Sequence, residues 1–175
     1  MRRVDEPRAK PPVDARSFEN AVTQKAAPPA PAEQKRCEYS RFMKRVRALV
    51  ARPVEECWRV FTDPVQLVTW VPGLRAAWLI AANADGLPRE VQFEFAKDLV
   101  YSLRYTYDAA EHVVRWEPRE GEAGAVRGFA HFETVDDGTE MTYALEHAPE
   151  RKAAERAIDD PDILVAAFAR LMHER

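Results

Sequence analysis

The chain has 175 residues and a net charge of −3, which fits one domain of ordinary size with some additional chain. This charge gives no reason to expect binding to nucleic acid. No apolar run approaches the ~18 residues of a membrane span, and the start, MRRVDEPRAK, lacks the apolar centre of a signal peptide. Cys37 and Cys57 form neither a disulfide framework nor a metal-ligand cluster. We therefore expect a soluble, cytoplasmic protein with no metal and no cofactor.

Residues 1–36 differ from the rest in composition. They are rich in proline and alanine, contain almost no large apolar residues, and carry eight Lys or Arg against five Asp or Glu. Such a segment cannot bury enough surface to offset chain entropy. We expect a disordered tail over 1–36 and a folded domain over 37–175. The tail is either a solvated extension or a docking segment for a protein partner.

The folded part opens with a strand over residues 39–50. Phe42, Val46, Ala48 and Val50 alternate with arginines, which is typical of a strand with one buried face. Lys44 falls on the apolar side, and we expect its amine to reach water from the strand end.

A helical corner is predicted over residues 51–74. Pro53 suits a first helical turn, and Val54, Cys57, Trp58 and Phe61 recur at helical spacing. Asp63 and Pro64 then match the N-cap and first residue of a second helix, which ends before Val71-Pro72-Gly73.

From here the apolar residues alternate with period two, and turn residues separate the segments. The short turns favour an antiparallel meander. The predicted strands are 76–83, 90–95, 99–108, 112–117, 125–134 and 139–147.

A helix closes the chain. ERKAAERAI predicts a first helical piece, and Asp160-Pro161 predicts the cap and start of the main piece. Leu164, Ala167, Phe168, Leu171 and Met172 form one apolar stripe. The open face of a curved sheet is the expected partner of that stripe.

These residues resemble a known superfamily. The chain is similar to the START-like, helix-grip (SRPBCC) pattern at two sets of positions. The first set is Ala51-x-Pro53, Trp58, Asp63-Pro64, Trp70 and Pro72-Gly73, and the later set is Tyr105-x-Tyr107-Asp108, Trp116 and Asp137-Gly138-Thr139. The branch is that of polyketide cyclases/dehydrases and coenzyme-Q-binding proteins. The match covers residues 39–175. The motifs are turn, cap and core residues, so they point to a fold more than to an activity.

The resemblance implies an α+β helix-grip fold: a seven-stranded antiparallel sheet wrapped around a long C-terminal helix, with two short helices between strands 1 and 2. It also implies an apolar cavity between sheet and helix. The final helix is interrupted at Pro161 and its connection is short, so we expect a smaller cavity than in lipid carriers.

The inward-facing residues of such a sheet and helix would bind a planar, partly polar ligand. The candidate ligand-binding residues are Trp70, Trp78, Phe93, Phe95, Tyr101, Leu103, Tyr105, Trp116, Phe132, Tyr143, Leu164, Phe168 and Leu171.

The chain contains no metal-ligand spacing, P-loop, dinucleotide fingerprint or nucleophile elbow. The candidate catalytic residues are therefore scattered ones, Tyr101, Tyr105, Arg104, His131 and Tyr143. His112 and His173 are expected to be solvated. His131 and His147 lie in paired strands, either as ordinary strand residues or with one imidazole at the cavity wall.

Three functions fit the sequence. The first is binding of a hydrophobic small molecule, such as a quinone, a lipid or a polyketide-like aromatic. The second is a polyketide cyclase/aromatase or dehydratase, in which cavity residues orient a substrate and exchange protons. The third is a regulatory protein whose tail captures a partner. We favour the first, because the aromatic inner face lacks a convergent catalytic constellation.

Overall fold

The computed structural model describes residues 43–96, 99–122 and 125–175. The predicted tail over 1–36, its boundary with the domain at residue 37, and the predicted strand residues 39–42 lie outside these ranges, as does Cys37. Among the described residues, Cys57 is buried as a free thiol. No helix in the described ranges is both long and apolar enough to cross a membrane.

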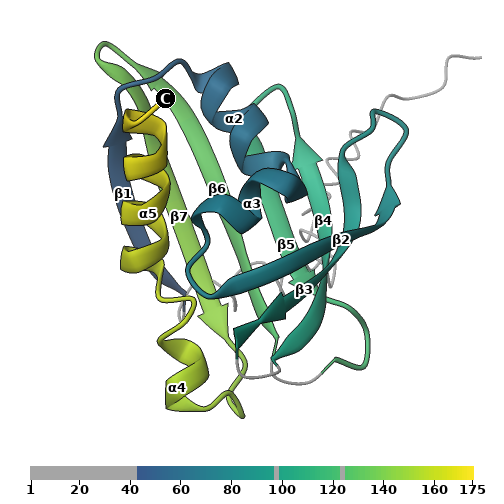
Figure 1. The fold of residues 1–175 in the computed structure, drawn as a ribbon. Helices are drawn as coiled ribbons and strands as arrows, with labels where there is room; N and C mark the ends of the chain where they lie inside the picture. Colours follow the sequence, from purple (N-terminus) through teal and green to yellow (C-terminus); the bar gives the residue numbers. More distant parts are fainter. Residues whose placement is uncertain (1–42, 97–98, 123–124) are drawn as a thin grey trace, which may run out of the picture.

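The strands pair in one antiparallel sheet, which curves across the molecule (Figure 1). Its order is β1-β7-β6-β5-β4-β3-β2, so β1 and β2 form the two edges. All seven predicted strands are confirmed within the described residues, and no end of β2 to β7 differs from the prediction by more than two residues. The strands are β1 (Lys44–Val50), β2 (Leu74–Ala82), β3 (Pro88–Phe95), β4 (Val100–Asp108), β5 (Val113–Pro118), β6 (Val126–Val135) and β7 (Gly138–His147).

Two Asp-Pro pairs set the starts of two helices, as predicted. Helix α2 (Val54–Thr62) ends at Asp63, whose side chain accepts a hydrogen bond from the Val65 amide at 2.9 Å and caps α3 (Pro64–Trp70). Asp160 caps α5 (Pro161–His173) in the same way, at 2.9 Å from the Asp162 amide. The predicted first helical piece is the short α4 (Ala153–Arg156). Pro53 occupies the N-cap position of α2, one residue before the turn expected for it.

The core lies where the sheet faces α2, α3 and α5 (Figure 1). Leu164, Ala167, Phe168 and Met172 of the predicted stripe are buried, and Leu171 is half-buried at the edge of the core. The Phe168 ring lies 5.2 Å from the Trp70 ring and 5.6 Å from the Phe61 ring, measured between centroids. Helix α5 is thus held against both the sheet and the helical corner.

Lys44 at the start of β1 reaches the start of α5. Its amine lies 2.9 Å from Asp160 Oδ1 and 2.5 Å from Asp162 Oδ2. The hydrogen bonds that the amine donates to these two carboxylates raise the pKa of Lys44, and the lysine lowers the pKa of Asp160. The amine is half exposed, as expected from the sequence, so the pair contributes little to stability.

Gly128 in β6 allows the Trp116 ring to lie close against the backbone. A Cβ at this position would lie 2.2 Å from the Ala144 carbonyl oxygen and 2.7 Å from Cζ2 of Trp116. We expect Gly128→Ala to lower the free energy of unfolding by about 1–3 kcal/mol, the usual cost of overpacking. Urea unfolding measures the loss, and near-UV circular dichroism reports the displaced indole.

Gly86→Ala is the matched control for this variant. A Cβ at Gly86 meets nothing within 4 Å, although the φ of +82° there opposes any side chain. Gly86→Ala should lower the free energy of unfolding by about 1 kcal/mol and leave the near-UV spectrum unchanged. If Gly128→Ala has the stability and the near-UV spectrum of the wild type, the close approach of Trp116 to the backbone does not contribute to stability.

Candidate ligand-binding site

An apolar cavity lies between the sheet, helix α3 and the first turn of α5. Its volume is about 80 Å³. The alternation of β3 and β4 builds much of the wall, because every second side chain of each strand faces inward. Nine of the predicted ligand-binding residues line it: Trp70, Phe93, Phe95, Tyr101, Leu103, Tyr105, Trp116, Tyr143 and Leu164.

Two groups of packed aromatic rings form much of the wall. Tyr101 stacks on Phe95 with centroids 5.4 Å apart and planes 17° apart, and Trp116 packs on Tyr143 at 5.2 Å. Such rings offer a large apolar surface with fixed shape. Trp70 adds a polar atom, since its indole Nε1 is buried without a hydrogen-bond partner among the described residues.

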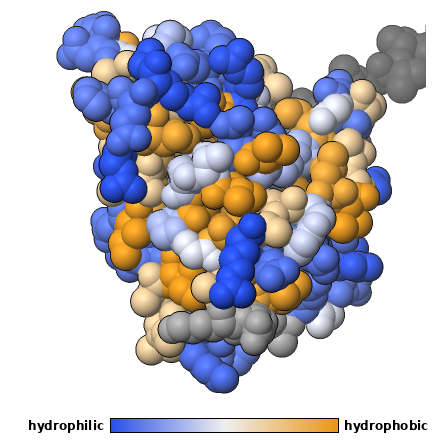
Figure 2. Space-filling view, in the orientation of Figure 1, coloured by the Kyte–Doolittle hydropathy of each residue, from blue (hydrophilic) through white to orange (hydrophobic). Residues whose placement is uncertain are grey.

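Half-buried lining residues mark where the cavity approaches solvent. They include Leu67 in α3, Val71 directly after it, and Tyr107 near the end of β4. Figure 2 shows apolar side chains gathered over this face of the molecule, around α3 and β2. Val65 and Val68 of α3 are among its exposed apolar residues.

Trp78 does not line the cavity, contrary to the prediction. It pairs with Gln92, an outward-facing residue of β3, whereas its neighbour Ala77 pairs with the inward-facing Phe93. Trp78 therefore points to the outer side of the sheet and is 45% exposed. The tryptophan of this strand thus belongs to the surface.

Phe132, Phe168 and Leu171 are also absent from the cavity wall. The Phe61 ring packs on Phe132 at 5.2 Å, and Phe61 and Trp70 both lie against Phe168. Since Phe61 and Trp70 themselves line the cavity, the two phenylalanines form a layer behind them. Leu171 lies two turns further along α5 than the lining residue Leu164.

Of the predicted catalytic residues, the three tyrosines line the cavity, but Arg104 and His131 do not. Arg104 is exposed and pairs with Glu90 and Glu117 on the outer side of the sheet. His131 is half-buried, with its Nδ1 3.6 Å from Glu133 Oε2. Both residues alternate with inward-facing neighbours, so the period of the strand directs them away from the cavity.

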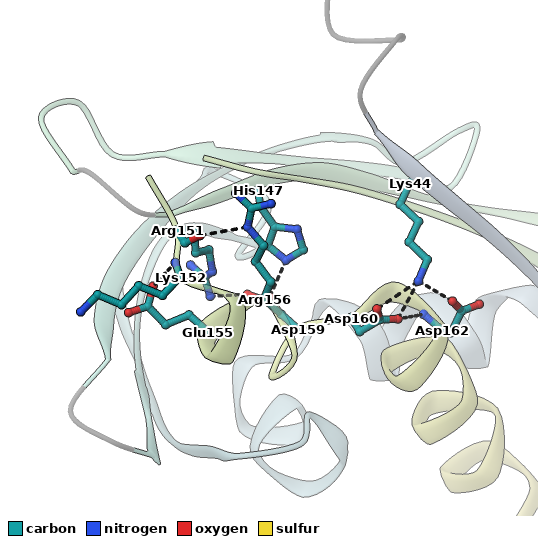
Figure 3. Close-up of polar contacts among 9 residues, drawn as sticks. All are labelled: Lys44, His147, Arg151, Lys152, Glu155, Arg156, Asp159, Asp160 and Asp162. Atoms are coloured by element: carbon teal, nitrogen blue, oxygen red, sulfur yellow. Dashed lines mark hydrogen bonds and ion pairs between the residues drawn. The ribbon is translucent and has the colours of Figure 1, made fainter. Parts of the chain in front are cut away.

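A buried charged cluster, missed from the sequence, closes one end of the cavity. Asp159, in the connection before α5, lines the cavity and is 3% exposed. His147 Nε2 lies 2.7 Å from its Oδ1, and Arg151 Nη2 donates to its Oδ2. Figure 3 shows both side chains reaching toward Asp159, apart from the contacts that Lys44 of β1 makes with Asp160 and Asp162. The Arg151 guanidinium also lies over the Tyr101 ring, 5.1 Å from its centroid.

The charged cluster acts on the cavity tyrosines. Burial raises the pKa of Tyr101, the charge of Asp159 raises it further, and Arg151 partly offsets both. Burial, then Asp159 and Tyr101, raise the pKa of Tyr143 well above its usual value. Both hydroxyls are therefore neutral at physiological pH and can donate or accept a hydrogen bond. The described residues bring together no group of three or more His, Cys, Asp or Glu that could hold a metal ion.

No protein-family model and no curated protein matches the chain. Solved structures do match it. A START superfamily protein from Mycobacterium smegmatis has a TM-score of 0.65 at 15% sequence identity, over 75% of this chain and 97% of that one. The chain has a START-like, helix-grip fold.

Two further solved structures share the START-like fold. A STAR-related lipid transfer protein from Xanthomonas axonopodis matches with a TM-score of 0.56 at 17% identity, over 75% of this chain and 85% of that one. The Zhui aromatase/cyclase from a Streptomyces species matches with a TM-score of 0.55 at 15% identity, over 76% and 95%. The fold predicted from the resemblance is confirmed. The C-terminal helix is interrupted before Pro161, as the sequence itself indicated.

Proposed function

We propose that the protein binds a hydrophobic small molecule in the cavity between the sheet, α3 and α5. The observation that carries this proposal is a cavity walled by packed aromatic rings with one buried polar end. Ligand sites commonly combine an apolar lining with a few placed polar groups. The START-like neighbours named for lipid transfer and for aromatase/cyclase activity support a hydrophobic ligand of the quinone, lipid or polyketide-like class.

The small cavity volume limits the ligand further. At about 80 Å³ it falls below the ~300–1,000 Å³ typical of sites for drug-sized ligands. It suits one ring, or the end of a longer molecule whose remainder leaves past the half-buried residues near α3. A long lipid enclosed along its whole length does not fit this volume.

Cyclase/aromatase or dehydratase chemistry is the alternative, and the site favours it less. General acids and bases work best with pKa values near the operating pH, whereas the pKa values of Tyr101, Tyr105 and Tyr143 are all raised above the usual value for tyrosine. Arg104 and His131 face away from the cavity. Asp159 is the one carboxylate among the described lining residues, and it already pairs with Arg151 and His147.

Tryptophan fluorescence can test the binding proposal, because Trp70 and Trp116 line the cavity. We expect saturable quenching by duroquinone, a one-ring quinone. Val91→Phe adds a ring at a buried lining position, and should weaken the affinity by about tenfold or more, equivalent to ~1.4 kcal/mol.

Val100→Phe is the matched control, since it makes the same substitution at an exposed position of β4. Its affinity for duroquinone should equal that of the wild type. Equal affinities in Val91→Phe and the wild type would place the ligand outside this cavity, and a lack of saturable quenching would count against the proposed function.

A further inference from the structure

The polar end of the cavity presents a carboxylate whose two hydrogen-bond partners do not line the ligand space. Asp159 lines the cavity, whereas Arg151 and His147 are not among the lining residues. The Arg151 side chain is wholly buried, donates to Asp159, and lies over the Tyr101 ring. A molecule in the cavity therefore meets the Asp159 carboxylate of the cluster and not Arg151 or His147.

The carboxylate retains acceptor capacity toward the cavity. Each carboxylate oxygen has two lone-pair sites, and His147 and Arg151 supply one donor to each oxygen. Tyr101 and Tyr143 line the same cavity as Asp159, and Arg151, which donates to Asp159, lies over the Tyr101 ring. One end of an otherwise apolar space thus combines an acceptor with two neutral hydroxyls.

This combination discriminates between ligand classes. A hydroxyl group can donate to Asp159 and accept from a tyrosine at the same time. A plain hydrocarbon would leave the buried acceptor unpaired, which costs binding free energy. A ligand carboxylate would bring a second negative charge next to Asp159 at low dielectric, where like charges repel strongly.

We propose that the polar end formed by Asp159, Tyr101 and Tyr143 selects an uncharged ligand of about one-ring size that carries a hydroxyl group. This rests on the proposed function, because it assumes that the cavity binds ligands at all. The hydroxyl enters first and donates to Asp159, and the apolar body fills the aromatic wall. Carboxylic acids, including fatty acids, are excluded by the charge of Asp159.

Three one-ring probes of similar shape test this selectivity on the full chain by isothermal titration calorimetry: toluene, p-cresol and p-toluate. We expect p-cresol to bind about tenfold or more tightly than toluene, and p-toluate not to bind at concentrations that saturate the p-cresol site. If no probe binds, the proposed function itself fails for ligands of this size. If toluene binds as tightly as p-cresol, or p-toluate binds at all, the selectivity proposed here is wrong while the binding function stands.

Variants locate the selectivity. Tyr143→Phe and Asp159→Asn should each reduce the p-cresol preference toward one while retaining affinity for toluene. Tyr143→Phe preserves shape and leaves the ion pair intact, so it tests the proposal even if Asp159→Asn folds poorly. Trp78→Phe is the control, because Trp78 points to the outer side of the sheet, is 45% exposed and does not line the cavity. An unchanged preference in Tyr143→Phe, or the same loss in Trp78→Phe, would overturn the assignment of the polar end.

Discussion

Replacing Asp159 by asparagine is expected to lower the free energy of unfolding by about 3–5 kcal/mol, the usual cost of removing one partner from a buried ion pair. Arg151, whose side chain has no exposed surface, would lose this carboxylate while it stays in the interior. His147 would lose the same carboxylate. Urea unfolding followed by tryptophan fluorescence measures the change.

A double variant separates the charge effect from a packing effect. Arg151→Met with Asp159→Leu removes both charges and keeps approximate volume, and such exchanges are often neutral or stabilising. It should recover most of the stability lost in Asp159→Asn. A loss below about 1 kcal/mol in Asp159→Asn, as at a surface pair, would mean that water reaches the cluster in solution.

Alkaline pH is expected to destabilise the protein steeply. Tyrosines in the unfolded chain release protons near the ordinary pKa of 10.0, whereas burial holds the pKa of Tyr101 and Tyr143 above this value in the folded state. Above about pH 10 the folded state therefore binds more protons than the unfolded state, and stability falls as pH rises. Each fully buried tyrosine contributes about 1.4 kcal/mol per pH unit, or about 2.7 for the pair.

The measurement is urea unfolding between about pH 8 and pH 11, followed by far-UV circular dichroism. Below pH 10 both tyrosines are protonated in both states, so this contribution to stability stays constant there. The double variant Tyr101→Phe, Tyr143→Phe should lose less free energy of unfolding per pH unit above about pH 10. The difference from the wild type should equal the contribution of these two tyrosines. A slope unchanged by the double substitution would show that these hydroxyls ionise freely in the folded protein.

Local signals in the sequence were sufficient for most of the fold. Asp63-Pro64 and Asp160-Pro161 fix where two helices begin, because an aspartate cap and a proline in the first turn act within four residues. The alternation in β3 and β4 assigned their inward faces correctly. These signals are local, so they can be read without the tertiary structure.

The polar end of the site could not be predicted, because it depends on contacts between distant segments. In the sequence, Asp159 directly precedes Asp160, and Asp160 alone is enough to cap the following helix. A second carboxylate next to this N-cap was the only available signal. The burial of Arg151 and the approach of His147 arise from the path of residues 148–160, which has no periodicity.

Trp78 was misplaced for a similar reason, since its direction depends on the register of β2 against β3, which contains several irregularities.

The pairing of β1 with β7 has a consequence for how the chain folds. Lys44 and Leu145 are register partners, so closing this edge brings together residues about a hundred positions apart, at a high cost in loop entropy. Every other pair of neighbouring strands in the sheet is consecutive in the sequence and can form by local pairing. We expect β1, which is made before the other six strands of this sheet, to be the last to join it, and refolding to be limited by its arrival.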